Sequence, residues 1–238
     1  MSEIAEQRRF YDDRWASFVY PGHLELDRVS KVVELMRNVR NYDRICDLGC
    51  GAGWIAGILG HFGKTLGVDL SDVTQARARF PSCEFISENI LEWQHPQQAF
   101  DLVISSEVIE HIPFVLQDKY LKIAFDLLAP GGSMILTTPN KWTMDAIPGG
   151  GRAWSNQPIE DWLDKRALVQ ALDKAGFNLR RCTSTTLGIG NIGAHRVVNS
   201  PRIMKTLEKL GLEDAWRSGA LAMGFGLHIA VLAEKPIA

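Results

Sequence analysis

One short stretch constrains this chain more than any other, the run from Ile45 to Gly53 with the sequence Ile-Cys-Asp-Leu-Gly-Cys-Gly-Ala-Gly. Its mostly apolar start predicts a short buried strand, and glycines at every second position predict a tight turn that leads into a helix near Trp54. Glycines at such a junction also let a bound molecule approach the backbone closely. The stretch therefore predicts an α/β sheet with a ligand site at the end of a strand.

A second apolar run, residues 65–68, ends in an acidic residue at a spacing that nucleotide-binding sheets use. Asp69 follows Gly49 by 20 residues, where such sheets place the acid that accepts hydrogen bonds from ribose hydroxyls. The dinucleotide pattern G-x-G-x-x-G suits a pyrophosphate, but Trp54 stands where its third glycine would be. A G-x-G-x-G turn with Asp47 ahead of it can instead make room for the amino acid part of S-adenosylmethionine.

Two stretches further along the chain resemble the class I S-adenosylmethionine-dependent methyltransferases. Residues 100–113, Phe-Asp-Leu-Val-Ile-Ser-Ser-Glu-Val-Ile-Glu-His-Ile-Pro, resemble the fourth strand and following loop of that family. Residues 128–140, Leu-Ala-Pro-Gly-Gly-Ser-Met-Ile-Leu-Thr-Thr-Pro-Asn, resemble its turn and fifth strand. The resemblance covers about residues 42 to 180. The nearest pattern is that of ubiquinone-type and related small-molecule O-methyltransferases.

This resemblance implies a Rossmann-like α/β fold with a seven-stranded sheet, helices on both faces, strand order 3-2-1-4-5-7-6 and an antiparallel last strand. It also implies S-adenosylmethionine as the cofactor. The implied cofactor-binding residues follow the strands or form the glycine turn: Asp47, Gly49, Cys50, Gly51, Gly53, Asp69, Leu70, Asn89, Ile90, Ser106 and Glu107. Family members commonly carry an aspartate at the position of Asn89, where it accepts a hydrogen bond from the adenine amino group. An asparagine carbonyl can accept the same bond.

We expect one domain with four parts. Residues 1–40 would form an N-terminal helical lid, 42–187 the cofactor-binding core, 188–224 an insertion that shapes the substrate pocket, and 225–238 the final strand. Periodicity and capping residues predict helices at 24–40 and 159–175, and one helix within the insertion. Ser71 is expected to cap the helix after the second strand, and residues 141–156 are expected to form a long loop.

Composition and the N-terminal sequence favour a single-domain cytosolic protein. At 238 residues and 46% hydrophobic, the chain can bury one sizeable core. The net charge is -2 with a pI near 6.3, and the 26 basic residues are scattered, which disfavours a dedicated nucleic-acid or anionic-membrane surface. The N-terminus lacks a signal peptide's apolar core, and no apolar run approaches the length of a membrane span. The four cysteines form no C-x-x-C pair and are expected to be reduced.

His111 is the predicted catalytic residue, because it follows the fourth strand beside the expected point of methyl transfer. It would act as a general base toward a hydroxyl acceptor, whereas an amine that binds neutral needs no base. The alternative is a histidine that only closes the loop by hydrogen bonding.

Glu107, Glu110 and His111 also form E-x-x-E-H, which resembles metal-dependent methyltransferases that modify the terminal ribose of small RNAs. Those enzymes complete the metal site with a further histidine, but the comparable stretch, residues 152–158, has none. The site is therefore predicted to be metal-free.

Substrate-binding residues are expected in the lid, the long loop and the insertion. They are aromatic or basic: Tyr11, Trp15, Tyr20, Trp142, Arg152 and His195. The competing interpretation is packing for the aromatic residues and a solvated or structural role for Arg152 and His195.

The resulting hypothesis is methyl transfer from S-adenosylmethionine to an oxygen of a small metabolite. The alternatives are an N-methyltransferase, a metal-assisted RNA methyltransferase, a nicotinamide-dependent oxidoreductase, and a non-catalytic protein that keeps the fold for binding. The acceptor molecule and the oligomeric state are left open.

Overall fold

The computed structural model describes residues 3–147, 157–185 and 200–237. The strands are β1 Arg44–Leu48, β2 Lys64–Asp69, β3 Glu84–Ser87, β4 Phe100–Ser106, β5 Leu128–Pro139, β6 Asn178–Thr185 and β7 His228–Glu234. The α-helices are α1 Glu3–Ala16, α2 His23–Met36, α3 Trp54–Leu59, α4 Thr74–Arg79, α5 Phe114–Leu127, α6 Lys141–Ala146, α7 Lys165–Ala175, α9 Pro201–Lys209 and α10 Glu213–Ala222. A short 3-10 helix, η1, spans Ile109–His111.

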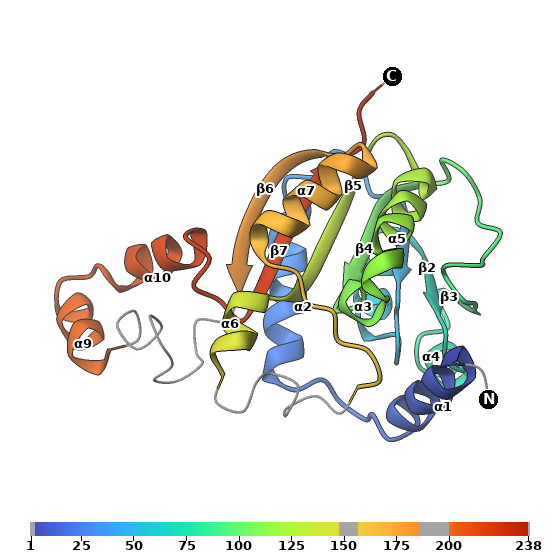
Figure 1. Cartoon of the computed structure of the whole chain (residues 1–238), viewed down its shortest axis with the longest axis horizontal. Helices are drawn as coiled ribbons and strands as arrows, with labels where there is room; N and C mark the ends of the chain where they lie inside the picture. Colours follow the sequence, from blue (N-terminus) through green and yellow to red (C-terminus); the bar gives the residue numbers. More distant parts are fainter. Residues whose placement is uncertain (1–2, 148–156, 186–199, 238) are drawn as a thin grey trace.

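The seven strands form one sheet in the order β3-β2-β1-β4-β5-β7-β6, with helices on both faces (Figure 1). Strands β1 to β5 pair with their neighbours in parallel, whereas β7 pairs antiparallel with both β5 and β6. The predicted fold class, strand order and antiparallel last strand are confirmed.

Alternate side chains of the central strands pack into two hydrophobic clusters, one on each face of the sheet. In β4, Leu102 and Ile104 face the cluster that α2 and α3 cover, whereas Val103 faces the cluster under α5 and α7. This period of two is the expected consequence of the pleat. Full burial of one such aliphatic side chain contributes about 1.5–3 kcal/mol. Because both faces are covered, the central strands read as continuous apolar runs in the sequence.

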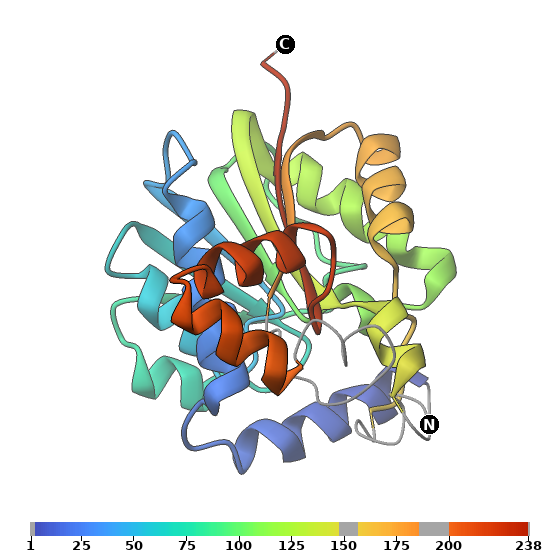
Figure 2. The same cartoon turned by 90° about the vertical axis from the view of Figure 1, so that its left-hand side faces the viewer.

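The carboxyl ends of β1, β2 and β4 meet at one edge of the sheet, because these strands are parallel neighbours. Helix α1 lies beyond this edge, across the lower end of the molecule (Figures 1 and 2). Helices α9 and α10 lie at the opposite end of the long axis from α1 and α4 (Figure 1). The N-terminal helix therefore lies close to the sheet edge at which ligands bind in open α/β folds.

Two predicted helix boundaries and one predicted loop are wrong. The predicted helix at residues 24–40 ends at Met36, and polar residues then form turns before β1. The helix predicted at 159–175 begins only at Lys165, because Asp164 caps it by accepting a hydrogen bond from Ala167 N at 2.8 Å. The predicted loop at 141–156 begins with α6, which Asn140 caps through the backbone N–H of Trp142.

Two further local predictions are wrong. The insertion contains a second helix, α10, where only one helix is expected. Ser71 does not cap α4. Its hydroxyl donates to Asp69 Oδ1, and Asp72 accepts from Thr74 N at 3.0 Å in the turn before α4, whose N-cap residue Val73 makes no side-chain capping bond. Ser71 lies two residues before the N-cap position, Val73, and its hydroxyl is directed to the buried Asp69 instead.

Candidate active site

The glycine turn after β1 needs glycine for two separate reasons. Gly49, Gly51 and Gly53 have φ angles of +76°, +49° and +81°, a region that other residues rarely adopt. Neighbouring side chains also leave no room for a Cβ atom at two of these positions. A Cβ on Gly49 would lie 2.3 Å from Val108 Cγ2, and one on Gly51 would lie 2.7 Å from the Trp15 ring. Backbone therefore faces the site wherever this turn borders it.

Asp69 ties the ends of β1 and β2 together. Its Oδ2 accepts a hydrogen bond from Gly51 N at 2.8 Å, and its Oδ1 accepts from both Ser71 N at 2.9 Å and Ser71 Oγ at 2.5 Å. A carboxylate has about four acceptor positions, so three internal bonds leave capacity on Oδ2. The carboxylate is thus held rigidly with one acceptor position to offer a ligand.

Two adjoining cavities of about 250 Å³ each open at the carboxyl edge of the sheet. We call them cavity 1 and cavity 2. Of the predicted cofactor residues, Asp69, Leu70, Asn89 and Ile90 line cavity 2, and Cys50, Gly51 and Ser106 line cavity 1. Residues that line both cavities mark the boundary between them: Tyr11, Trp15, Gly49, Glu107 and His111.

Asn89 already uses one of the acceptor positions on its side chain. Its side-chain Oδ1 already accepts a hydrogen bond from Leu91 N at 3.1 Å, which shapes the loop after β3. The carbonyl keeps a second acceptor position. Asn89 therefore stays a predicted adenine contact with one of its two acceptor positions in use.

Asp47 and Gly53 lie behind the turn, not among the described residues that line either cavity. Asp47 is 1% exposed and receives a hydrogen bond from the backbone of Ala56, while its Oδ2 is buried with no hydrogen-bond partner among the described residues. Burial raises the pKa of Asp47 to about 7. A Cβ on Gly53 would meet Ala76 and Phe85, so this glycine serves packing.

We expect Asp47→Asn to raise stability at pH 8 by about 1 kcal/mol, and to have no such effect at pH 3. The folded-state pKa of Asp47, about 7, exceeds the usual aspartate value of 3.8, so stability is lost as pH rises between these two values. Asparagine removes this loss, but its buried amide offsets part of the gain. Thermal unfolding of both proteins at the two pH values measures the difference, and a protein that is less stable than the original at pH 8 would contradict it.

Glu107 stands at the boundary between the cavities in an unusual conformation. Its φ of +57° is rare for a residue with a side chain, and such strain is concentrated at functional sites. The carboxylate accepts a hydrogen bond from Thr137 Oγ1 at 2.9 Å, lies 3.3 Å from Nε2 of His228, and lies 3.9 Å from a guanidinium nitrogen of Arg28. Elements α2, β5 and β7 therefore all contribute a side chain that holds this carboxylate.

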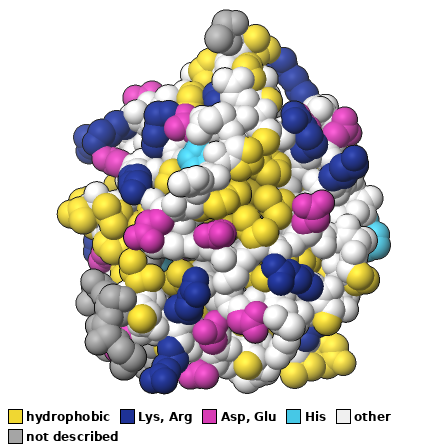
Figure 3. Space-filling model, turned by 90° about the vertical axis from the view of Figure 1, so that its right-hand side faces the viewer, with side chains coloured by type: hydrophobic (Ala, Val, Ile, Leu, Met, Phe, Trp, Pro, Cys, Tyr) yellow, Lys and Arg dark blue, Asp and Glu magenta, His cyan; other side chains and the backbone are white. Residues whose placement is uncertain are grey.

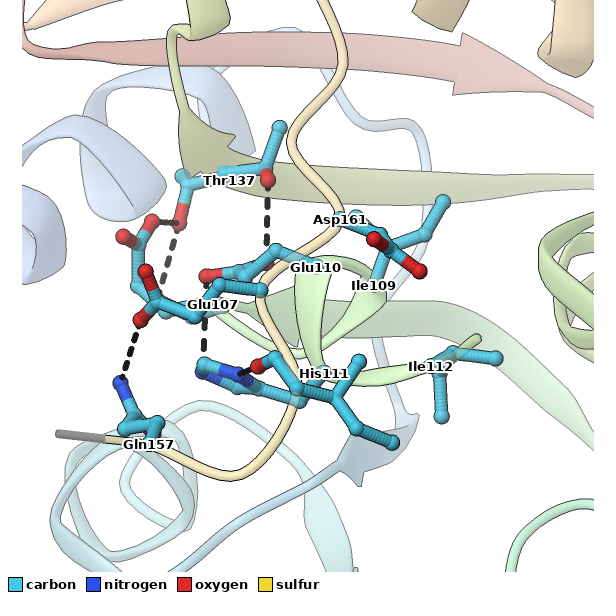
Figure 4. Close-up of polar contacts among 12 residues, drawn as sticks. Glu107, Ile109, Glu110, His111, Ile112, Thr137, Gln157 and Asp161 are labelled. Atoms are coloured by element: carbon cyan, nitrogen blue, oxygen red, sulfur yellow. Dashed lines mark hydrogen bonds and ion pairs between the residues drawn. The ribbon is translucent and has the colours of Figure 1, made fainter. Parts of the chain in front are cut away.

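Glu110 lies beside Glu107 but is 1% exposed, and its Oε2 accepts a hydrogen bond from Thr138 Oγ1 at 2.9 Å. Burial and the negative charge of Glu107 raise the pKa of Glu110 well above its usual range. Figure 4 shows Glu107, Glu110 and His111 gathered in one place. The Glu110 carboxyl therefore anchors the loop after β4 to β5.

His111 has one nitrogen engaged and one available. Its Nδ1 lies 2.9 Å from the backbone oxygen of Ile159, and because a carbonyl only accepts, Nδ1 carries the hydrogen. In the neutral ring Nε2 then holds a lone pair, and it lies 3.8 Å from Glu110 Oε1. Burial lowers the pKa of His111 from its usual 6.5. The histidine is therefore held neutral at pH 7, in the tautomer that can accept a proton at Nε2.

The partner of His111 comes from a segment for which the sequence predicts a helix. Residues 157–164 run without regular structure, and Gln117 holds this segment against η1. Its Nε2 lies within 3.3 Å of three backbone oxygens, those of Ile109, Ile112 and Asp161. A buried glutamine on α5 thus positions the carbonyl that orients His111.

Helix α1 covers the boundary between the cavities. Its Tyr11 hydroxyl donates to Gln157 Oε1 at 3.1 Å, and Gln7 Nε2 donates to the backbone oxygen of His111 at 3.0 Å. Trp15 packs over Gly51 and keeps its ring nitrogen buried without a hydrogen-bond partner among the described residues. Tyr11 and Trp15, two of the predicted substrate residues, therefore do line the cavities, and α1 occupies the position expected of a lid.

The other predicted substrate residues do not join them. Tyr20 is 78% exposed and packs against Trp54, and Trp142 packs edge to face against Phe225. Neither belongs to the described residues that line the two cavities. Arg152 and His195 lie outside the described residues. Tyr20 lies in the segment between α1 and α2, and Trp142 lies in the first turn of α6, and local sequence does not reveal the direction in which either side chain points.

Within residues 3–147, 157–185 and 200–237, no three His, Cys, Asp or Glu side chains are arranged to hold a metal ion. In the E-x-x-E-H stretch, Glu107 and Glu110 contact threonine hydroxyls of β5. Residues 152–156 lie outside the described residues, and they belong to the stretch 152–158 in which the sequence has no histidine.

Charged side chains on the face near α4 and β3 are interspersed, and hydrophobic side chains gather in its middle (Figure 3). No helix in the described part of the chain is both long and apolar enough to cross a membrane.

Comparison with known proteins supports the predicted methyltransferase family. A family model described as a methyltransferase domain matches residues 13–181. A trans-aconitate 2-methyltransferase of Escherichia fergusonii is 31% identical over 54% of this chain and 52% of its own length. A probable S-adenosylmethionine-dependent methyltransferase of Mycolicibacterium smegmatis is 30% identical over 61% of this chain and 54% of its own length. The chain thus spans about half the length of these curated relatives.

Among solved structures, the N-methyltransferase NodS of Bradyrhizobium japonicum, in complex with S-adenosylhomocysteine, has a similar fold. The TM-score is 0.66 at 14% identity, and the match covers 99% of this chain and 100% of the other. Identity this low supports the fold alone. The predicted class I assignment and the predicted cofactor are confirmed at the level of the family, whereas nearness to ubiquinone-type enzymes stays a prediction. The family match over residues 13–181, on this fold, shows that the chain belongs to the class I S-adenosylmethionine-dependent methyltransferases.

Proposed function

We propose that this chain transfers the methyl group of S-adenosylmethionine to an oxygen atom of a small molecule in cavity 1. When bound, the cofactor supplies a methyl group that its sulfonium has already activated. The residues of the chain then have to align the acceptor, exclude water and, for a hydroxyl acceptor, take up one proton.

The glycine turn and Asp69 fit this cofactor. Cavity 2 offers the free acceptor capacity of Asp69 for ribose hydroxyls and the apolar side chains of Leu70 and Ile90 for a flat base. The bare backbone of Gly49 and Gly51 leads from there into cavity 1, where an amino acid end would lie. In this proposal the reactive methyl group therefore stands at the boundary between the cavities.

An acceptor would occupy the part of cavity 1 under α1 and α2. Tryptophans at positions 15, 54 and 162 line this part, together with Arg14 and Glu160. Such walls suit a small molecule with an apolar body and a few polar groups. The relatives named trans-aconitate 2-methyltransferase support a small-molecule acceptor.

His111 is the proposed general base, and its position carries the proposal. It lines both cavities, and its bond to Ile159 leaves Nε2 to accept a hydroxyl proton. Glu110 Oε1 lies 3.8 Å from this nitrogen. An acceptor that binds as a carboxylate or a neutral amine would not need this base.

Methyl transfer from S-adenosylmethionine with a labelled methyl group tests the proposal. A panel of small hydroxy compounds, phenols and carboxylic acids, including trans-aconitate, should yield at least one labelled ester or ether. We expect exhaustive chelation to leave this rate unchanged within about twofold, because the proposed chemistry uses only side chains. A rate that chelation abolishes and Mg²⁺ or Mn²⁺ restores, with Glu107→Gln preventing the rescue, would favour the metal-assisted alternative. Product with amines only would shift the acceptor atom to nitrogen.

A further inference from the structure

His228, the first residue of β7, is a buried histidine behind the wall of the site. It is 3% exposed and is not among the described residues that line the two cavities. Its Nε2 lies 3.3 Å from Glu107 Oε2, and its Nδ1 lies 3.3 Å from Thr185 Oγ1 on β6. The β6–β7 hairpin therefore reaches the boundary between the cavities through this ring and Glu107.

The ring of His228 is neutral at pH 7, with its hydrogen on Nε2. Burial lowers the pKa of His228 from its usual 6.5. A carboxylate only accepts, so the neutral ring is stable beside Glu107 with the hydrogen on Nε2, and Nδ1 then accepts from the Thr185 hydroxyl. The ring thus directs an N–H group at one oxygen of Glu107 from a fixed position in the sheet.

Arg28 competes with His228 for the same oxygen of Glu107. The guanidinium of Arg28 lies 3.9 Å from Glu107 Oε2 on one side and 3.7 Å from Glu25 Oε1 on the other, both too far for a hydrogen bond. Thr137 holds the other oxygen of Glu107, Oε1, at 2.9 Å. Without the N–H group of His228, Oε2 would turn toward Arg28, and the negative charge would move away from the boundary between the cavities.

A carboxylate at this boundary favours a ligand that is positively charged there. The Glu107 side chain is only 15% exposed, so solvent screens its charge less than at the surface. Because Arg28 is shared between two carboxylates, it does not neutralise both of them. In the proposed function the sulfur atom of the cofactor lies at this boundary. That sulfur is positively charged in S-adenosylmethionine and uncharged in the product, S-adenosylhomocysteine.

We propose that His228 is a positioning residue that holds the Glu107 carboxylate at the boundary, so that the site binds the charged cofactor in preference to the uncharged product. This inference rests on the proposed function, because it assumes that the sulfur atom lies beside Glu107. His228 acts through Glu107 and is separated from the ligand by it. The β6–β7 hairpin thereby takes part in the exchange of product for fresh cofactor.

Calorimetry with each of the two ligands, in the absence of an acceptor, tests this inference. The quantity compared is the ratio of the two dissociation constants. His228→Leu removes the N–H group, so the affinity for S-adenosylmethionine should fall about 3–10-fold, the scale of moving one partly buried charge by a few ångströms. The affinity for S-adenosylhomocysteine should change by less than about twofold, because its sulfur carries no charge.

A double-mutant comparison shows whether His228 acts through Glu107. Glu107→Gln removes the charge itself and should reduce the preference for S-adenosylmethionine at least as much as His228→Leu does. In the Glu107→Gln protein, His228→Leu should then cause no further change in the ratio.

Three further variants make the comparison specific. His228→Gln keeps an N–H donor near the position of Nε2 and should retain the original ratio. The shorter amide of His228→Asn does not reach Glu107, so this variant should behave like His228→Leu and replaces it if thermal unfolding shows that protein to be unfolded. Ser184→Ala is the control, because Ser184 is buried next to Thr185 but on the other face of β6, and it should leave both affinities unchanged.

An unchanged ratio in folded His228→Leu or Glu107→Gln protein would overturn the inference. So would an equal loss for both ligands in His228→Leu, which would mean that His228 only packs the hairpin. These outcomes leave the proposed function standing, since the original protein would still bind the cofactor and its product. Failure of the original protein to bind either ligand would instead remove the proposed function, and this inference with it.

Discussion

Replacing His111 by alanine should lower the single-turnover rate of methyl transfer to a hydroxyl acceptor by about 10²–10⁴-fold. General-base assistance operates in the transition state, so the affinity for S-adenosylmethionine should stay nearly constant. The measurement is rapid-quench methyl transfer with the acceptor that the labelling panel identifies. His61, an exposed histidine just after the end of α3, provides the matched control, and His61→Ala should keep the original rate.

The pH dependence of the same rate separates a base from a structural histidine. The neutral form of His111 is the active one, and burial lowers its pKa from 6.5. Turnover should therefore rise with pH below 6.5 and be flat at neutral pH, and His111→Ala should lose this rising limb. A variant with a near-normal rate and the same limb would eliminate the base. An amine acceptor, or a hydroxyl that is already ionised on binding, would then explain the chemistry better.

Asp69→Ala should weaken binding of S-adenosylmethionine by about 1.5–3 kcal/mol, the scale of charge-assisted hydrogen bonds to a ligand. The remaining acceptor capacity of Asp69 faces cavity 2, where the ribose is proposed to lie. Calorimetry gives the affinity, and thermal unfolding shows how much of the loss comes from the turn, because Asp69 also holds Gly51 and Ser71.

Asp72 offers a matched control three residues away. It accepts a hydrogen bond from Thr74 N at an exposed position before α4, so Asp72→Ala should lower stability by about 1 kcal/mol without changing cofactor affinity. Unchanged affinity in a folded Asp69→Ala protein would place the ribose elsewhere. It would also contradict the alignment of the second strand on which the cofactor assignment depends.

The sheet could be predicted from the sequence because its signals are local. Each central strand is a short apolar run, and the glycine turn and Asp69 fix where two of them end. The order of the last strands came from the family resemblance, since antiparallel pairing of β7 between β5 and β6 leaves no mark that periodicity detects. The cofactor residues of cavity 2 lie at these strand ends, which is why they could be named in advance.

The charged and polar partners in the site could not be predicted, because they come together only through tertiary contacts. Glu107 meets His228, which is 121 positions later in the chain and stands at the start of β7. Gln117 reaches the carbonyl of Asp161 across 44 positions. In the helical interpretation of residues 159–164 the Ile159 carbonyl would bond within a helix. Only the late start of α7 frees that oxygen for His111.

A crystal structure of the protein with S-adenosylhomocysteine tests the central claim most directly. The account predicts adenosine in cavity 2, with ribose hydroxyls within hydrogen-bond distance of Asp69. It also predicts the sulfur atom at the boundary between the cavities, beside Gly49, Glu107 and His111, where it faces the open part of cavity 1. Adenosine bound in cavity 1, or a sulfur atom that His111 and Glu107 do not border, would contradict the account.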